Sequence, residues 1–168
     1  MPHQRFAGVT GAGAIMSTHE AMKAKTQGMP RKTVSVNGRP YLTRFYGGID
    51  ANGCDVWYHN FLASDGDRHL HNHPFTATSN IICGGYLEEI ETPDGIVDRL
   101  RVQRSEAATI GPSTWHRIKA VMPETWTIMQ IERGRRLPFW FFIEQDGSYT
   151  AVKSSPPDWW KSADKKGQ

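Results

Sequence analysis

The sequence has only two cysteines among 168 residues, Cys54 and Cys83. Two thiols cannot build a disulfide framework, and a chain of this length can bury a core without one. No apolar run reaches the roughly 20 residues that a membrane-spanning helix needs. The N-terminus also lacks a basic segment followed by a long apolar one, which argues against a cleaved signal. We therefore expect a reduced, cytoplasmic protein with no membrane contact.

A large excess of charge of one sign is also missing. Lys and Arg number 20 and Asp and Glu number 17, for a formal net charge of +3. Residues 1–50 carry seven basic and two acidic side chains, whereas residues 51–132 carry six basic and eleven acidic ones. The central segment is therefore acidic, which argues against nucleic acid as its partner. Only the N-terminal arm and the arginines near residue 135 keep that option open.

Long helical patterns are absent between residue 33 and residue 153, and short strand patterns take their place. The segments rich in β-branched and aromatic residues are 33–36, 41–46, 56–62, 76–83, 86–91, 96–102, 117–121, 126–131 and 139–143. Each is bounded by Gly, Pro, Asp or Asn, as strands are. Asn37-Gly38 between the first two predicts a hairpin. The pattern predicts an all-β sandwich or barrel in one domain, residues 33–153.

The two ends have a different composition. Residues 1–32 are predicted to be an arm with a short helix from about Thr18 to Lys25, because Ser17 and Glu20 have the spacing of a capping box. A partly ordered arm without a helix is the alternative. Residues 154–168 are predicted to be a tail in which Trp159 and Trp160 cover part of the barrel and the polar end frays.

Three of the seven histidines stand close together, at His69, His71 and His73. Residues two apart on a strand face the same way, so His71 and His73 can direct their imidazoles at one point. His116 is the candidate for a third ligand, and His69 competes for the role because it has the same phase. Three imidazoles suit Fe(II), Ni, Cu or Zn and leave coordination positions open for chemistry. On spacing alone, histidines that hold no metal are the alternative.

The residues around these histidines resemble the two motifs of the cupin family. The first motif resembles residues 67–75 followed by 81–89, where a histidine pair precedes a strand that ends in glycine. The second resembles Gly111-Pro112 with Trp115-His116-Arg117. The likeness covers about Tyr41 to Phe142 and is closest to the small single-domain cupins of bacteriophage and prophage genomes. It implies a jelly-roll barrel (double-stranded β-helix), a metal on His71, His73 and His116, and a homodimer formed through edge strands.

The glutamate that is usual in the first cupin motif falls at Thr78, which leaves three histidines without a carboxylate. In this respect the chain resembles the thiol dioxygenases, the group that includes cysteine dioxygenase. The resemblance implies Fe(II), with Ni, Mn or Zn as alternatives, and assigns Arg44 to the carboxylate of the substrate. The cysteine that some members cross-link to a tyrosine would also fall at Thr78. The late His-x-Tyr pattern corresponds to residues 130–133, where neither residue occurs, so a cysteine-specific enzyme is not expected.

Two further residues complete the predicted catalytic set of Arg44, Tyr86 and Glu88. If the strand after Gly85 alternates regularly, Glu88 faces inward as a fourth ligand or a general base, and Tyr86 is in phase with it. The favoured function is a metal-dependent oxygenase acting on a small anionic molecule of the thiol or amino-acid type. One alternative is a non-catalytic, metal-containing cupin that binds a small metabolite or nucleotide. Another is a DNA- or nucleotide-directed protein, for which the sequence contains no motif.

Overall fold

The computed structural model describes residues 16–36, 38–64, 69–134, 136–143 and 147–153. The predictions for residues 1–15, for Asp67 and Arg68 and for the tail from residue 154 lie outside these ranges. The described residues form α1 (Thr18–Thr26), β1 (Arg31–Val36), β2 (Arg39–Ile49), β3 (Asp55–Phe61), β4 (Ala77–Cys83), β5 (Gly85–Thr92), β6 (Gly95–Val102), β7 (Ala108–Ile110), β8 (His116–Val121), β9 (Trp126–Ile131), β10 (Phe139–Ile143) and β11 (Tyr149–Lys153). The expected all-β class with one short N-terminal helix is confirmed.

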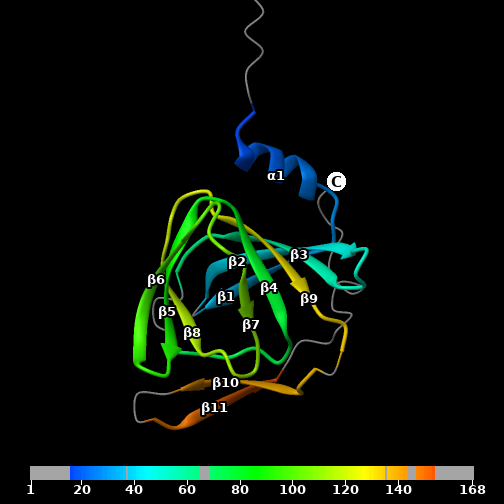
Figure 1. The fold of residues 1–168 in the computed structure, drawn as a ribbon. Helices are drawn as coiled ribbons and strands as arrows, with labels where there is room; N and C mark the ends of the chain where they lie inside the picture. Colours follow the sequence, from blue (N-terminus) through cyan, green and yellow to red (C-terminus); the bar gives the residue numbers. More distant parts are fainter. Residues whose placement is uncertain (1–15, 37, 65–68, 135, 144–146, 154–168) are drawn as a thin grey trace, which may run out of the picture.

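The strands pair in three antiparallel groups. The largest sheet has the order β1-β2-β3-β9-β4-β7, the second has the order β6-β5-β8, and β10 pairs with β11. Figure 1 shows the two larger sheets facing one another as the walls of a barrel, with β10 and β11 across one end. Neighbouring strands often come from distant parts of the sequence. The first predicted motif (residues 67–75 and 81–89) and the second (residues 111–117) can therefore meet in the barrel although they are separate in the sequence. The interior between the sheets is where their side chains meet.

The predicted hairpin and helix are both present. β1 and β2 pair in antiparallel fashion around Gly38, whose φ of +76° suits a residue without a side chain. β1 begins at Arg31, within the segment that the sequence assigned to the arm. Ser17 caps α1, because its side-chain oxygen accepts a hydrogen bond from the Glu20 backbone N–H at 3.2 Å. Among the described residues, no helix is long and apolar enough to cross a membrane.

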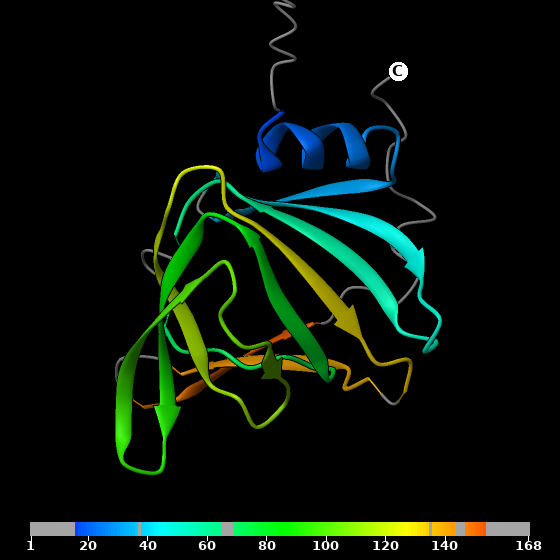
Figure 2. The ribbon, with the colours of Figure 1, turned by 45° about the horizontal axis from the view of Figure 1, so that its top comes forward.

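Helix α1 fixes which face of the large sheet points outward. Met22 packs with Phe45, Val56, Tyr58 and Trp126, and the Trp126 indole N–H donates to His19 Nδ1 at 3.1 Å. Figure 2 shows the helix lying across this outer side. Because side chains alternate along a strand, the residues between these, such as Trp57 and His59, face the barrel interior. This alternation determines the inner wall discussed below.

Two strands were not expected from the sequence. β7 has only three residues, Ala108–Ile110, and it is held by pairing with β4 rather than by its own length. β11 follows a turn and pairs with β10 from Phe139↔Lys153 to Ile143↔Tyr149. Its Tyr, Thr and Val residues are typical of a strand, so its signal was present in the sequence.

Candidate metal centre

His71, His73 and His116 come together as the sequence predicted. Their ligand atoms all lie within 4.8 Å of one another, and His73 Nε2 is 2.9 Å from His116 Nε2. His69 is not a member of this cluster. Two of the rings, His71 and His116, are buried, and His73 is partly buried. The described residues therefore contain one group of three imidazoles that face a common point.

The segment that carries His71 and His73 is not the regular strand that the spacing argument assumed. His71 instead forms isolated bridges, one to His116 and one to Phe142. The His71 N–H donates to the His116 carbonyl at 2.9 Å, and the His116 N–H donates to the His71 carbonyl at 3.0 Å. This reciprocal backbone pair, and not strand alternation over several residues, brings the two motifs together.

Asn72, which the sequence analysis did not single out, holds this segment in place. Its amide donates from Nδ2 to the Pro112 carbonyl at 2.8 Å, and its Oδ1 accepts from the Phe141 N–H at 2.8 Å. The side chain is buried, so these bonds are shielded from water. The sequence did contain a signal for this role: Asn72 is a polar residue between two predicted ligands, and its side chain faces away from them. Asn72 thus links the histidine pair to the segment before His116 and to β10.

Aromatic side chains of β10 cover the histidines. The Trp140 and Phe142 rings lie 5.5 and 5.3 Å from the His71 ring, and Trp140 stacks on His73 at 6.2 Å between centroids. Burial here, followed by the nearby His116 and His59, lowers the pKa of His73 well below its usual value. A neutral imidazole is the form that binds metal, so this environment favours ligation.

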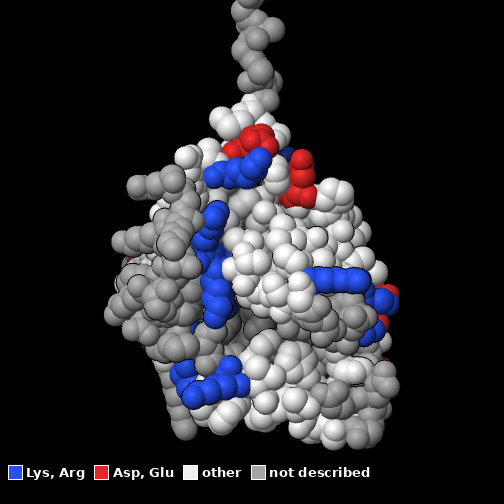
Figure 3. Space-filling view, turned by 180° about the vertical axis from the view of Figure 1, so that it is seen from behind, with Lys and Arg blue, Asp and Glu red and all other residues white. Residues whose placement is uncertain are grey.

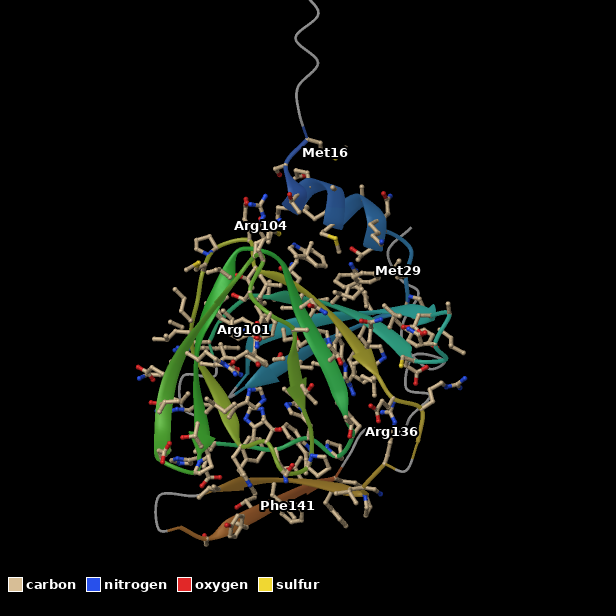
Figure 4. The ribbon with its side chains drawn as sticks, in the orientation of Figure 1. Met16, Met29, Arg101, Arg104, Arg136 and Phe141 are labelled. Atoms are coloured by element: carbon tan, nitrogen blue, oxygen red, sulfur yellow. The ribbon has the colours of Figure 1, made fainter. Side chains whose placement is uncertain are left out.

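Glu88 faces inward, as alternation along β5 predicted, and contacts the far side of His116. Its Oε2 lies 3.2 Å from His116 Nδ1, and its Oε1 accepts from Arg99 Nε at 2.8 Å. Figure 4 shows Arg101 inside the barrel, and its Nη1 lies 3.7 Å from Glu88 Oε1. Burial alone would raise the pKa of Glu88, but the hydrogen bonds with His116 and Arg99 hold it below its ordinary value. Glu88 therefore lies behind His116, on the side opposite His73.

Tyr86 is buried two residues before Glu88. Its ring lies 5.7 Å from Phe61, and its hydroxyl hydrogen-bonds Ser79. Burial and the nearby Glu88 raise its pKa to about 12, so the phenol stays protonated. The structure brings Tyr86 to the inner wall, within the apolar cluster around Phe61 rather than beside the histidines.

Arg44 lies on β2, on the inner face of the large sheet. Its guanidinium stands 5.0 Å from the centroid of the Trp57 ring, and its cross-strand neighbour is His59. Burial, then the charge of Arg136, lowers the pKa of Arg44 to about 10, so the side chain remains a cation at neutral pH. Arg44 is thus a partly buried positive charge on the inner wall of the barrel.

Thr78 and Arg117 both face away from the interior. Along β4 the residues Ala77 and Ser79 are buried, and Thr78 alternates with them toward the other face. A role for Thr78 in place of the usual cupin glutamate is therefore not supported by its position. Arg117 forms an ion pair with Glu89.

The three histidines fit a divalent transition metal. Ligand nitrogens about 2.0–2.1 Å from a metal and at right angles to each other lie about 2.9 Å apart. This is the separation between His73 Nε2 and His116 Nε2, and the complete set of ligand atoms lies within 4.8 Å. The Glu88 contact with His116 Nδ1 also matches the carboxylate–histidine arrangement that orients metal-bound imidazoles. Three neutral nitrogens favour Fe, Ni, Cu or Zn over Mg or Ca.

No protein-family model and no curated protein sequence matches this chain. Solved structures of similar fold include a cupin-2 domain protein from Rhodospirillum rubrum, at 14% identity over 71% of this chain and 78% of that chain, with a TM-score of 0.48. They also include the Fe(II) form of HppE, at 12% identity over 73% of this chain and 62% of that chain, with a TM-score of 0.48. The match thus spans less than two thirds of the HppE chain.

A third similar structure is Pac13 from Streptomyces, described as a nucleoside dehydratase. Its identity is 8% over 74% of this chain and 86% of that chain, with a TM-score of 0.42. At identities this low the likeness concerns the course of the backbone. The chemistry of this chain is therefore argued from its own residues.

Proposed function

We propose that the protein is a cupin-type, mononuclear metal-dependent enzyme that resembles non-haem Fe(II) dioxygenases and acts on a small anionic substrate. The observation that carries the proposal is the convergence of three imidazoles from two distant segments, with a buried carboxylate behind one of them. A histidine cluster that served only packing would not need ligand atoms so close together in an apolar enclosure. Thiol acids and amino acids are the first substrates to test, since the resemblance to thiol dioxygenases suggests them.

Each residue of the site has a role that follows from its contacts. His71, His73 and His116 would hold the metal, and a bound Fe(II) would supply open coordination positions and one-electron chemistry with O2. Glu88 keeps the proton of His116 on Nδ1, which leaves Nε2 free to bind. Trp140 and Phe142 exclude water from the histidines. Arg44 supplies positive charge for an anionic group.

The metal assignment is tested by elemental analysis of the full chain after anaerobic loading with Fe(II). We expect about one metal per chain in the wild type and in His69→Ala, and none above background in His71→Ala or His116→Ala. His69→Ala is the matched control because it removes a neighbouring imidazole outside the cluster. Stoichiometric metal in either of the other variants would overturn the three-histidine site.

Activity is tested by oxygen consumption of the Fe(II)-loaded protein with thiol acids and amino acids. We expect substrate-dependent consumption that the His116→Ala variant lacks. Tight binding of such molecules with no oxidation would instead favour the non-catalytic alternative, a metal-containing cupin that binds a small metabolite or nucleotide.

A further inference from the structure

Three polar side chains form a row across the inner face of the large sheet. Arg44 on β2 is paired in register with His59 on β3, and His59 is paired with Thr127 on β9. His59 is 4% exposed and Thr127 is 1% exposed. Along β3 the row is flanked by Trp57 and Phe61, which are apolar and buried. The polar row therefore interrupts a wall that is otherwise built for packing.

Two members of the row have buried polar atoms that the described residues do not satisfy. His59 Nε2 and Thr127 Oγ1 are both buried and have no hydrogen-bond partner there. Buried polar groups in folded proteins are nearly always hydrogen-bonded, and two such atoms on cross-strand neighbours are a costly coincidence. Their arrangement indicates a polar group of a ligand between them.

The charges around the row restrict what that ligand can be. Burial, followed by the charge of Arg44, lowers the pKa of His59 to about 3, so the imidazole is neutral and offers one donor and one acceptor. Arg44 and Arg136 both stand over Trp57, at 5.0 and 5.8 Å from the ring centroid. This part of the wall attracts anions and repels cations.

The buried carboxylates of the described residues are already engaged. Glu88 contacts Arg99, Arg101 and His116. Asp55 contacts Arg133 and Arg136, and its Oδ1 accepts from the Tyr46 hydroxyl. An ammonium group beside the row would therefore be repelled by Arg44. Both buried carboxylates already have partners, so neither is available to pair with it.

We infer that the row binds a small carboxylic acid that carries a hydroxyl group, with its carboxylate on Arg44 and its hydroxyl between His59 and Thr127. The inference rests on the proposed function for its place beside the metal. Within the class of small anions it favours hydroxy acids over the thiol acids and amino acids that the resemblance suggests. Ring contacts connect the two sites: Trp57 lies 6.0 Å from His59 and 5.9 Å from Phe75 between centroids. The Phe75 ring in turn lies 5.5 Å from that of His73. An unsubstituted acid would leave His59 and Thr127 without partners, and an amino acid would bring the wrong charge.

Three probes with the same carbon skeleton test this ligand class: lactate, propionate and alanine. Each is titrated by calorimetry into the full-length, metal-free protein. Lactate is expected to bind about tenfold more tightly than propionate, as one well-made buried hydrogen bond allows, and alanine more weakly than propionate. Alanine binding as tightly as lactate, or no binding of lactate at about 10 mM, overturns the inference. Because the order of the three affinities is measured on the wild-type protein, this test does not depend on whether any variant folds.

Variants then locate the contacts. Thr127→Val keeps the shape of the side chain and removes its hydroxyl, so the lactate affinity should fall toward that of propionate while the propionate affinity stays unchanged. Arg44→Met should weaken lactate and propionate to a similar degree. Thr109→Val, at an exposed position of β7, is the matched control and should change neither affinity. Unchanged discrimination in Thr127→Val overturns the assignment of the row.

Metal content is measured on the same preparations, so the two proposals fail separately. If the protein binds no metal but its affinities for the three acids follow the expected order, the proposed function is rejected and the inferred acid-binding row is retained. If metal binds at the histidines but lactate, propionate and alanine do not bind in the expected order, the inferred ligand class is rejected and the metal site is retained.

Discussion

Glu88 is the residue on which the orientation of His116 depends. Glu88→Gln keeps the shape of the side chain but removes the negative charge that lies 3.2 Å from His116 Nδ1. We expect metal affinity to fall about 10–100-fold, the usual effect of losing such a partner. A competition titration against a chelator measures this.

Glu89→Gln is the matched control for that measurement, because it changes the next residue, which pairs with Arg117 and Lys119 instead. Metal affinity should stay at the wild-type value in this control. Equal affinities in both variants would show that Glu88 does not position His116.

At the residue scale, the sequence predicted what depends on spacing and alternation. The inward direction of Glu88 follows from alternation along β5, whereas the grouping of His71, His73 and His116 was predicted from the resemblance to the two cupin motifs. The partner of Glu88 could not be predicted, because the pairing of β5 with β8 is what places it against His116. Asn72 escaped notice for the same reason, since its partners Pro112 and Phe141 are distant in the sequence.

Asn72 joins three elements, so its removal should affect the fold at the scale of elements. Asn72→Ala removes the hydrogen bonds to the Phe141 N–H and the Pro112 carbonyl and leaves both groups poorly satisfied. We expect the free energy of unfolding to fall by about 2–3 kcal/mol, given about 1–1.5 kcal/mol for each bond. Urea unfolding of the metal-free chain measures the loss.

Asn80→Ala, on a partly buried position of β4, is a control for a generic asparagine effect. A loss for Asn72→Ala no larger than that of the control would contradict the linking role.

The pairing of β5 with β8 has an ionic component on its outer face. The hydrogen bonds with Arg117 and Lys119 lower the pKa of Glu89, even though burial opposes them. A carboxyl group whose pKa is lower in the folded state stabilises the fold. Its contribution is complete when the pH is above the pKa of the unfolded Glu, about 4.3. That contribution is lost as the pH falls through the folded pKa.

The pH dependence gives a direct prediction for Glu89→Gln. At pH 7 the variant should unfold about 0.5–1 kcal/mol more easily than the wild type, since the pair is partly exposed. The difference should be smaller at a pH below about 4.3, because protonation of the wild-type carboxyl removes this contribution as the pH falls through its folded pKa. Denaturant midpoints at the two pH values provide the comparison. A difference that grows on acidification would contradict the sign of the shift.

Elements were predictable where the signal was local. The Asn37-Gly38 hairpin and the Ser17 cap are encoded by adjacent residues, and both predictions are confirmed. The short strand β7 and the bridge at His71 exist only because distant segments pair with them. For the same reason the histidine segment was wrongly taken as a regular strand, although His71, His73 and His116 do lie close together.

At the scale of the whole molecule, the homodimer remains a prediction, and the free edge of β6 is where we expect it to form. β6 is the outer strand of its sheet, and Ile96 and Leu100 on one face of it are 59% and 56% exposed. An edge strand with exposed apolar residues favours pairing with another edge. Light scattering should give twice the chain mass for the wild type and the single mass for Leu100→Lys. Wild type and variant both at the single mass would contradict the expectation.

The basic side chains that Figure 3 shows are dispersed over one face of the molecule. On the face in Figure 3, Lys and Arg side chains stand in separate groups and do not form one continuous patch. Nucleic-acid binding usually depends on a continuous basic surface that follows the phosphate backbone. Residues 1–15 of the arm and Arg135 of the late loop lie outside the described residues, so a nucleic-acid contact there stays a prediction.

Backbone hydrogen bonds between β10 and the segment around His71 allow the opening of this end of the barrel to be measured. The Phe141 N–H donates to Asn72, and the Ile143 N–H donates to the Leu70 carbonyl. These amides of β10 exchange with solvent only when the strand separates from the histidine segment. Their hydrogen–deuterium exchange rates therefore measure how often the histidines become uncovered. That frequency sets an upper limit on how fast a ligand or an ion can enter or leave by this end.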